Sequence, residues 1–271
     1  YSVLSSGSKG NCIYLESDRA KVLIDSGLSV KELERRLASI GRKAEELDAV
    51  FLTHEHSDHV SGVGPLVRRY GIPLYATEGT MRAGEKSLGR TAQCQLIRAG
   101  EPVRVDGLAL EPYATSHDAR ESVAYVVHCK NRKLGHATDM GTITPTAREK
   151  LKNAHVLLVE SNHDVEMLDV GPYPWSVKQR IKSKLGHLSN EACGVLLATL
   201  SHFDLSKKKD LYENFNNYAL YVYQMKAKSR GQVKNFMGVP YVKYDFDDFD
   251  YYQIHKAIKR TSELFLSQGA E

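Results

Sequence analysis

The chain has 271 residues, 42% of them hydrophobic, which is enough to bury a sizeable core. Its formal net charge of +4 is mildly basic, which is compatible with a phosphate-rich partner without being evidence for one. No apolar run approaches the ~20 residues of a membrane span, so we expect no membrane partner. Four scattered cysteines with no Cys-x-x-Cys pair indicate reduced thiols in a cytoplasmic protein and argue against a disulfide framework or a zinc knuckle.

The first elements are expected to be short strands. Two apolar runs, at residues 12–15 and 21–24, flank a short polar connection and predict a hairpin. Asp25 ends the second run, where it is either a turn residue or an acceptor that holds the ring of a metal-bound histidine. Ser29 and Glu32 have the spacing of a capping box, which predicts that a helix begins there.

A dense cluster of potential metal ligands follows the next apolar run. Residues 54–59 read HEHSDH, three histidines and an aspartate in six positions. If the chain is still extended there, His54 and His56 point the same way and can hold one cation. Asp58 and His59 are adjacent where the chain turns into a helix, so they diverge and suit a second cation. A polar loop with scattered histidines is the plainer interpretation, and a binuclear site without thiolate ligands is the one we favour.

The rest of the chain alternates clusters of strands with helices. This order predicts two mixed sheets face to face with helices outside, an α/β four-layer αββα sandwich. We expect the catalytic core at residues 1–205, and a C-terminal strand and helix region at 206–271 that completes the domain. The expected helices are Val63–Tyr70, a short one after Gly79, and Asn190–Leu200, and the expected strands are 49–53, 73–76, 95–97, 108–113, 122–129, 132–137 and 155–160.

Further ligands of a binuclear site have to come from later strand ends. His117 and Asp139 each follow an expected strand, as the first cluster does. Glu160 ends another strand, and His187 stands just before the last of these helices. Each of these four is otherwise an ordinary loop or cap residue. His163 is open between a pocket residue and a turn residue.

The HxHxDH spacing of residues 54–59 resembles the signature of the metallo-β-lactamase superfamily, and further segments resemble its WalJ/YycJ-type branch in bacteria. The likeness covers residues 1 to about 200. It implies the metallo-β-lactamase fold and two divalent ions, Zn²⁺ or Mn²⁺ or else Fe²⁺. It also implies that His117 completes the first metal's ligands and that Asp139 bridges both metals. The matching segments are 6–11 (SGSKGN), 23–27 (LIDSG), 53–62, 116–119 (SHDA), 137–141 (ATDMG), 160–164 (ESNHD), 171–174 (GPYP) and 186–191 (GHLSNE).

The resemblance also implies a function. That branch is associated with 5′-to-3′ exonuclease activity on double-stranded DNA, so we expect DNA as the substrate. Asp58 would bind one metal and orient the attacking water, and Glu160 would hold the ring of His187, which assists the leaving oxygen. One alternative is a small-molecule metallohydrolase acting on thioesters, lactones or cyclic phosphodiesters. Another is a metal-containing DNA-binding protein without turnover. No oligomeric state is predicted.

The C-terminal region departs from the pattern of that branch. The pattern has one more histidine, a ligand of the second metal, at the end of a strand after the last helix. His202 is the nearby candidate, but its distance from His187 leaves no room for both the helix and the strand. The tyrosine-rich run at 218–224 looks like the strand and holds no histidine, so this ligand is unassigned. Lysines of this region are either phosphate contacts or a solvated face.

Overall fold

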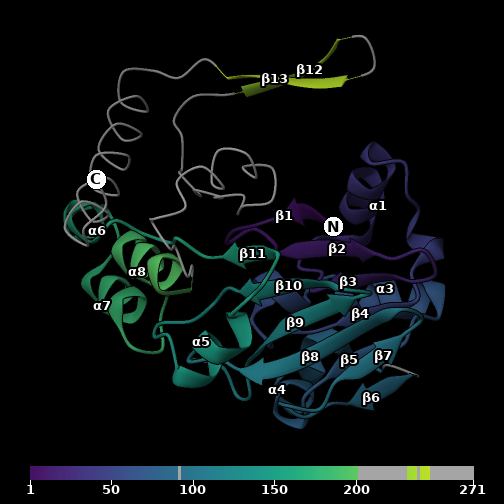
Figure 1. Cartoon of the computed structure of the whole chain (residues 1–271), viewed down its shortest axis with the longest axis horizontal. Coiled ribbons are helices and arrows are strands. Elements are labelled where there is room, and N and C mark those ends of the chain that lie inside the picture. Colours follow the sequence, from purple (N-terminus) through teal and green to yellow (C-terminus); the bar gives the residue numbers. More distant parts are fainter. Residues whose placement is uncertain (91–92, 201–230, 237–238, 245–271) are drawn as a thin grey trace.

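The computed structural model describes residues 1–90, 93–200, 231–236 and 239–244, and its main feature is a pair of mixed β-sheets (Figure 1). The first sheet has the strand order β1-β2-β3-β4-β5-β6. Its first three strands pair antiparallel and the others pair parallel. The central strand β4 is buried at all three positions, as expected of a parallel strand covered on both faces. The strands are β1 (Ser2–Ser5), β2 (Cys12–Glu16), β3 (Lys21–Ile24), β4 (Ala49–Phe51), β5 (Leu74–Ala76) and β6 (Cys94–Leu96).

The second sheet has the order β11-β10-β9-β8-β7. In this sheet β7 pairs with β8, β8 with β9 and β9 with β10, all antiparallel. The edge strand β11 pairs with β10 in parallel. The first five positions of β9 are buried, because this strand is covered on both faces. The strands are β7 (Val103–Val105), β8 (Leu108–Ala114), β9 (Val123–Cys129), β10 (Arg132–Ala137) and β11 (Val156–Val159).

Helices cover the outer faces of both sheets. Ser29 caps the first helix by accepting the backbone N–H of Glu32 at 3.3 Å, as its spacing predicts. The Glu32 carboxylate pairs with Arg35 and Arg36 instead of returning to the cap, so the expected capping box is formed only in its first half. The helices are α1 (Val30–Ser39), the 3₁₀ turn η1 (Ala44–Glu46), α2 (Ser57–Val60), α3 (Val63–Tyr70), α4 (Glu78–Leu88), α5 (Pro145–Leu151), α6 (Val165–Val170), α7 (Trp175–Lys182) and α8 (Asn190–Leu200).

Three apolar clusters separate four layers. The first lies between the first sheet and the helices α1, α3 and α4, and includes Leu33 and Leu66. The second lies between the two sheets, where the rings of Phe51 and Tyr125 meet edge to face at 5.7 Å. The third packs α5 and α8, including Leu196, on the outer face of the second sheet. The expected αββα sandwich is therefore confirmed.

The expected elements up to Leu200 are found with small shifts in their ends. The helix expected after Gly79 begins at Glu78, two residues before the expected start, with Thr77 as its cap. The sequence did not predict the helices α5, α6 and α7. The expected domain boundary at 205, the strand at 218–224, the expected helix of the C-terminal region and His202 lie outside the described residues.

Beyond Leu200 the structure describes one antiparallel hairpin, β12 (Gly231–Phe236) and β13 (Val239–Tyr244). All four cysteines are free, as their spacing predicts. Within the described part of the chain, no helix combines the length and the apolar character that crossing a bilayer requires.

Candidate metal centre

The ligand cluster begins where β3 and β4 end side by side. Asp25 follows β3 in the left-handed region, with φ of 60°, and its backbone N–H donates to Phe51 at the end of β4. Its carboxylate accepts both the backbone N–H and the hydroxyl of Thr53, each at 2.8 Å. These bonds fix the direction in which the chain leaves the sheet, and they hold the start of the histidine cluster at its edge.

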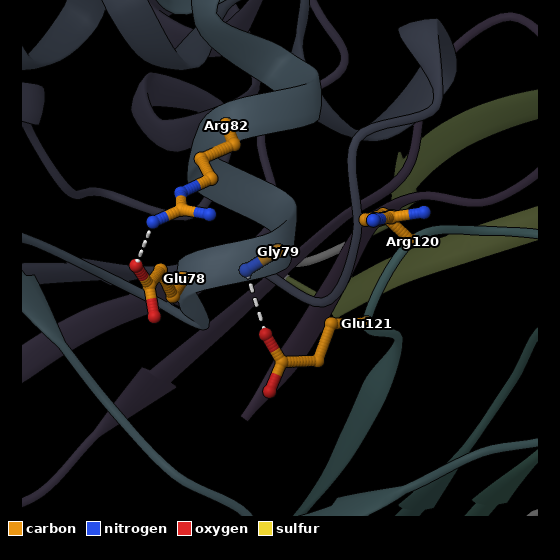
Figure 2. Close-up of a pocket in the computed structure, with 5 residues that line it drawn as sticks. All are labelled: Glu78, Gly79, Arg82, Arg120 and Glu121. Atoms are coloured by element: carbon orange, nitrogen blue, oxygen red, sulfur yellow. Dashed lines mark hydrogen bonds and ion pairs between the residues drawn. The ribbon is translucent and has the colours of Figure 1, made fainter.

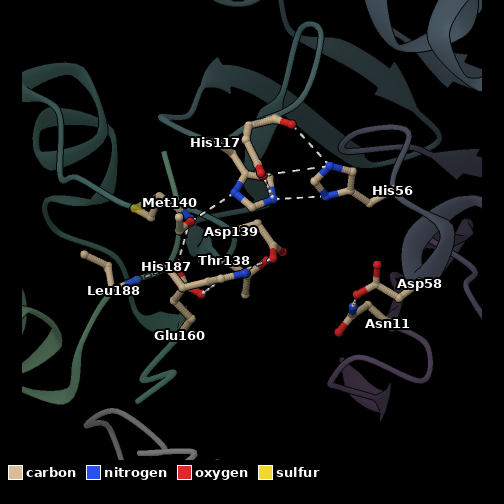
Figure 3. A network of polar contacts seen from close by, with 12 residues as sticks. Asn11, His56, Asp58, His117, Thr138, Asp139, Met140, Glu160, His187 and Leu188 are labelled. Carbon is tan, nitrogen blue, oxygen red and sulfur yellow. Dashed lines mark hydrogen bonds and ion pairs between the residues drawn. The ribbon is translucent and has the colours of Figure 1, made fainter. Parts of the chain in front are cut away.

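The first group of potential ligands is His54, His56 and His117, with ligand atoms within 4.8 Å of one another. His54 and His56 come from the loop after β4, and His117 follows β8 on the other sheet. The Nδ1 of His117 lies 3.0 Å from the carbonyl oxygen of Gly186, to which it can donate. That contact leaves Nε2 of His117 facing His56 Nδ1, at 3.2 Å (Figure 3). The structure thus brings together His54 and His56, which the sequence assigned to one cation, and His117, which the resemblance added to them.

The second group is His54, His59 and Asp139, again within 4.8 Å. His59 lies in α2, and its Nδ1 is 2.8 Å from Oδ2 of Asp25. Its other ring nitrogen, Nε2, faces the Oδ2 atom of Asp139 at 3.5 Å. Asp139 also has a positive φ, of 56°, which turns the chain sharply after β10. Asp25 is therefore not only a turn residue: it holds the ring of His59.

The third group is His117, Asp139 and His187. His187 precedes α8, and its Nδ1 lies 3.0 Å from Oε2 of Glu160 and 3.6 Å from Oδ1 of Asp139. The other oxygen of Glu160 accepts the backbone N–H groups of Met140, at 2.7 Å, and of Leu188, at 3.2 Å. Glu160 therefore ties the ends of β10 and β11 to the segment that carries His187, the residue with which the resemblance pairs it.

Asp58 belongs to none of the three groups found among the described residues. Its Oδ2 atom accepts the side-chain amide of Asn11 at 3.0 Å and lies 3.5 Å from Nε2 of His59. The same amide nitrogen of Asn11 lies 2.9 Å from His59 Nε2, and its oxygen accepts the backbone N–H of Gly7. Asp58 is therefore at the edge of the second group, where the side-chain amide of Asn11 holds it.

The donor set fits divalent cations. The Nε2 atom of His54 is buried and has no hydrogen-bond partner in the described part of the chain. Burial and the neighbouring histidines lower the pKa of His54, so its ring is the neutral imidazole that a metal needs. Burial alone would lower the pKa of His59, but the carboxylates of Asp25 and Asp139 raise it to about 9. The surroundings of His59 therefore favour a positive charge, whether it is a proton or a metal ion.

The structure also contains contacts that the sequence did not predict. Asp118, next to His117, forms a two-pronged ion pair with Arg180 of α7. Its Oδ1 atom lies 3.5 Å from His117 Nε2, and its carbonyl oxygen lies 3.2 Å from Nε2 of His56. No local signal could have found this pair, because 62 residues separate its members. Asn11 was detectable only as part of the matching turn at 6–11.

His163 lies close to the third group without joining it. Its carbonyl oxygen accepts the backbone N–H of Asn190, and it bridges to Ser189 at the start of α8. Its Nδ1 atom is buried with no hydrogen-bond partner among the residues described. Burial lowers the pKa of His163. His163 is thus half-buried beside the segment that carries His187. It has features of both a turn residue and a pocket residue, because its backbone bonds to the start of α8 and its Nδ1 atom is buried.

A separate hollow of about 250 Å³ lies over the start of α4 (Figure 2). It is lined by Glu78, Gly79, Arg82, Arg120 and Glu121, none of which belongs to the three ligand groups. Its charges are largely compensated: Arg82 pairs with Glu78, and Glu121 accepts the N–H of Gly79 at 2.6 Å. This hollow is therefore distinct from the histidine and carboxylate cluster.

This fold and this cluster define a class of metal-dependent hydrolases, and the comparison with known proteins identifies the family. The family model described as the beta-lactamase superfamily domain matches residues 20–203. The chain belongs to this superfamily, and its likeness to the WalJ/YycJ-type branch is borne out by relatives of that type.

One such relative, from Bacillus anthracis, is named exodeoxyribonuclease YycJ and is 40% identical over 200 residues, covering 73% of this chain and 76% of its own. Another, from Streptococcus pneumoniae, is named exodeoxyribonuclease WalJ and is 39% identical over 254 residues. That match covers 90% of this chain and 93% of the relative, so it extends beyond Leu200.

Among solved structures, the metallo-β-lactamase fold protein YhfI from Bacillus subtilis matches with a TM-score of 0.56 at 19% identity, covering 72% of this chain and 76% of its own. A diphosphatase of the PhnP family matches with a TM-score of 0.52 at 22% identity, covering 70% and 68%. At these identities the likeness supports the fold alone.

Proposed function

We propose that this chain is a metal-dependent nuclease that degrades double-stranded DNA from the 5′ end. The observation that carries the proposal is that Asp139 is shared by two ligand groups, one with His54 and His59 and one with His117 and His187. A carboxylate in that position can bridge two cations. The exodeoxyribonuclease names of two relatives at about 40% identity support DNA as the substrate.

In this proposal His54, His56 and His117 would hold one divalent ion, Zn²⁺, Mn²⁺ or Fe²⁺, and Asp139 would be a ligand shared with a second. His59 and Asp58 would be further ligands of the second ion. Two such ions would supply Lewis-acid polarisation of the phosphoryl oxygens and would acidify water. Three of these imidazoles, those of His54, His59 and His117, are buried, and burial strengthens the charge interactions around them.

His187 is proposed to act as the general acid. Burial alone would lower its pKa, but the hydrogen bond to Glu160 outweighs burial and raises it. A ring with a raised pKa holds its proton to higher pH than a free imidazole does, and it can give that proton to the leaving oxygen of the cleaved strand. Glu160 keeps the ring in one orientation, since its own position is fixed by the backbone N–H groups of Met140 and Leu188.

Asp58 is proposed to orient the attacking water as well as to bind an ion. Its carboxylate has one oxygen engaged by the Asn11 amide, at 3.0 Å, which holds the side chain beside His59. The other oxygen can accept a hydrogen bond from water and direct its lone pair at phosphorus. Because the proposed substrate is DNA and all four cysteines are unpaired, we also propose the cytoplasm as the place of action.

The test is a cleavage assay on duplex DNA labelled at either the 5′ or the 3′ end, with Mn²⁺ or Zn²⁺ added. We expect the 5′ label to be released first as mononucleotides or short products. A thioester and a lactone serve as comparison substrates. Hydrolysis of those esters without loss of DNA label would mean that the site serves small molecules, and metal-loaded protein that binds DNA without cutting it would be a binding protein.

A further inference from the structure

The helix α7 and the segments beside it present an unusual surface. Trp175, the single tryptophan of the chain, is 70% exposed, and Tyr173 is 49% exposed. No side chain of α7 is fully buried. Lys178 and Lys182 follow Trp175 at the helical spacings of three and seven residues, which places them on the same face. The ammonium of Lys182 lies 6.0 Å from the centre of the Trp175 ring.

This surface is also positively charged. Between Val170 and Gly186 the sequence has four basic residues and no acidic one. Lys182 pairs with Asp169, whereas the Lys178 ammonium donates to the carbonyl oxygen of Asp169. In the part of the chain that the structure covers, neither Lys178 nor Lys184 has a carboxylate partner. We call the set Tyr173, Trp175, Lys178 and Lys184 the α7 platform; Lys178 is half-buried and the other three are exposed.

The helix α7 is joined directly to the ligand cluster. Arg180 of α7 forms an ion pair with the carboxylate of Asp118, whose Oδ1 atom lies 3.5 Å from Nε2 of His117. A second contact is made by the backbone N–H of His187, which donates to the carbonyl oxygen of Ile181 in α7, at 3.0 Å. The last turn of α7 is thus tied to the segments that carry two of the potential ligands.

We propose that the α7 platform holds the unpaired end of the DNA strand that is being degraded, with a base stacked on Trp175 and phosphates on Lys178 and Lys184. This inference rests on the proposed nuclease function. A scissile phosphate has to reach imidazoles that are largely buried, so the strand has to leave its partner first. Separated bases expose their flat faces, and an aromatic ring beside lysines binds such a strand without regard to sequence. The exposed ring and the ammonium groups without carboxylate partners match that chemistry.

The test measures binding separately from cleavage. Fluorescence anisotropy of metal-loaded protein is recorded with a labelled phosphorothioate oligonucleotide, which resists hydrolysis, carrying an unpaired 5′ end. We expect Trp175→Ala to raise the Kd about tenfold, because loss of one base–aromatic stack has effects of that order. Leu96→Ala is the matched control, an exposed apolar side chain on β6, and should leave the Kd unchanged. Hydrolysis of bis(4-nitrophenyl) phosphate, which has no base to stack, should be the same in both variants and the wild type.

The lysines are tested by salt dependence. The double variant Lys178→Gln/Lys184→Gln should flatten the plot of log Kd against log salt by about 0.7 for each single-strand phosphate that a lysine no longer neutralises. Lys31→Gln/Lys86→Gln, exposed lysines on α1 and α4, should leave the slope unchanged.

The outcomes separate the platform proposal from the proposed nuclease function. An unchanged Kd and slope in the platform variants, or no binding by the wild type, overturns the platform. Weaker binding by Trp175→Ala in a protein that never cleaves DNA supports the platform and contradicts the nuclease function.

Discussion

Asp25 and His59 are joined by a 2.8 Å contact between a carboxylate oxygen and Nδ1 of the ring, although they lie 34 residues apart. The same carboxylate accepts two hydrogen bonds from Thr53 at the start of the histidine cluster. One buried side chain therefore sets both the direction of the loop and the orientation of a potential ligand. Carboxylates in this role tune metal sites by fixing the tautomer and the basicity of the histidine.

The first prediction concerns Asp25→Asn. Asparagine tolerates the positive φ at this position and keeps one acceptor for Thr53, but it removes the charge opposite His59. We expect metal affinity to fall about 10- to 100-fold, as for other losses of a ligand-supporting carboxylate. Competition with a chelating dye measures it. Asp48→Asn is the control, because that carboxylate accepts the backbone N–H of Lys21 at the opposite end of β3. Equal affinities in the wild type and both variants would contradict the role given to Asp25.

The second prediction separates proton transfer from metal binding at His187. His187→Ala should lower turnover on DNA by about 10²- to 10⁴-fold, the range for loss of a general acid, with metal content unchanged. Glu160→Gln should lower turnover less, because the ring remains but is less firmly oriented and less basic. Metal analysis beside the cleavage assay reads both effects. Loss of one ion in His187→Ala would instead make His187 a ligand, together with His117 and Asp139.

The third prediction concerns Gly27, which lies against the metal loop. A Cβ atom at Gly27 would lie 1.7 Å from the carbonyl oxygen of Asp58, a backbone atom that cannot be moved without shifting the loop. We expect Gly27→Ala to lower both the melting temperature and the metal content. The control is Gly84→Ala inside α4, where the nearest atom, of Leu88, is 3.3 Å away. That change should be neutral or stabilise the helix by up to ~1 kcal/mol. A melting temperature of Gly27→Ala equal to that of the wild type would show that the close approach is not required.

The fourth prediction concerns removal of metal. Ions that bind only the folded chain stabilise it by about 2.7 kcal/mol at a free concentration 100 times the Kd. For a domain of this size that corresponds to a fall of roughly 5–10 °C in the melting temperature after chelation. Adding back Zn²⁺ or Mn²⁺ should restore it. Calorimetry in chelator and in added metal measures the difference, and identical transitions would argue against occupied sites.

The local features of the site could be read from the sequence. His54 and His56 were predicted to share a cation because alternate residues of an extended chain point the same way, and the structure puts them in one group. Glu160 and His187 were paired by resemblance, and their contact is 3.0 Å. Asp139 followed from its place at a strand end, where open α/β sheets gather their ligands.

Other features depend on tertiary contacts and were not predictable. Arg180 meets Asp118 across 62 residues, and Asn11 meets Asp58 across 47. The helix α7 has no fully buried side chain, so it lacks the apolar stripe by which a helix is recognised in a sequence. Because no side chain of α7 is buried, Trp175 is exposed as well.

The most direct test of the account is metal stoichiometry measured beside DNA cleavage in the wild type, His56→Ala and Asp139→Asn. Asparagine is chosen at Asp139 because it tolerates the φ of 56° while removing the bridging charge. We predict two divalent ions per wild-type chain, with release of the 5′ label from duplex DNA. Both variants should lose at least one ion and at least ~100-fold in turnover. Cleavage that stays within a few-fold of wild type in either variant, or that persists in chelator, would contradict the account.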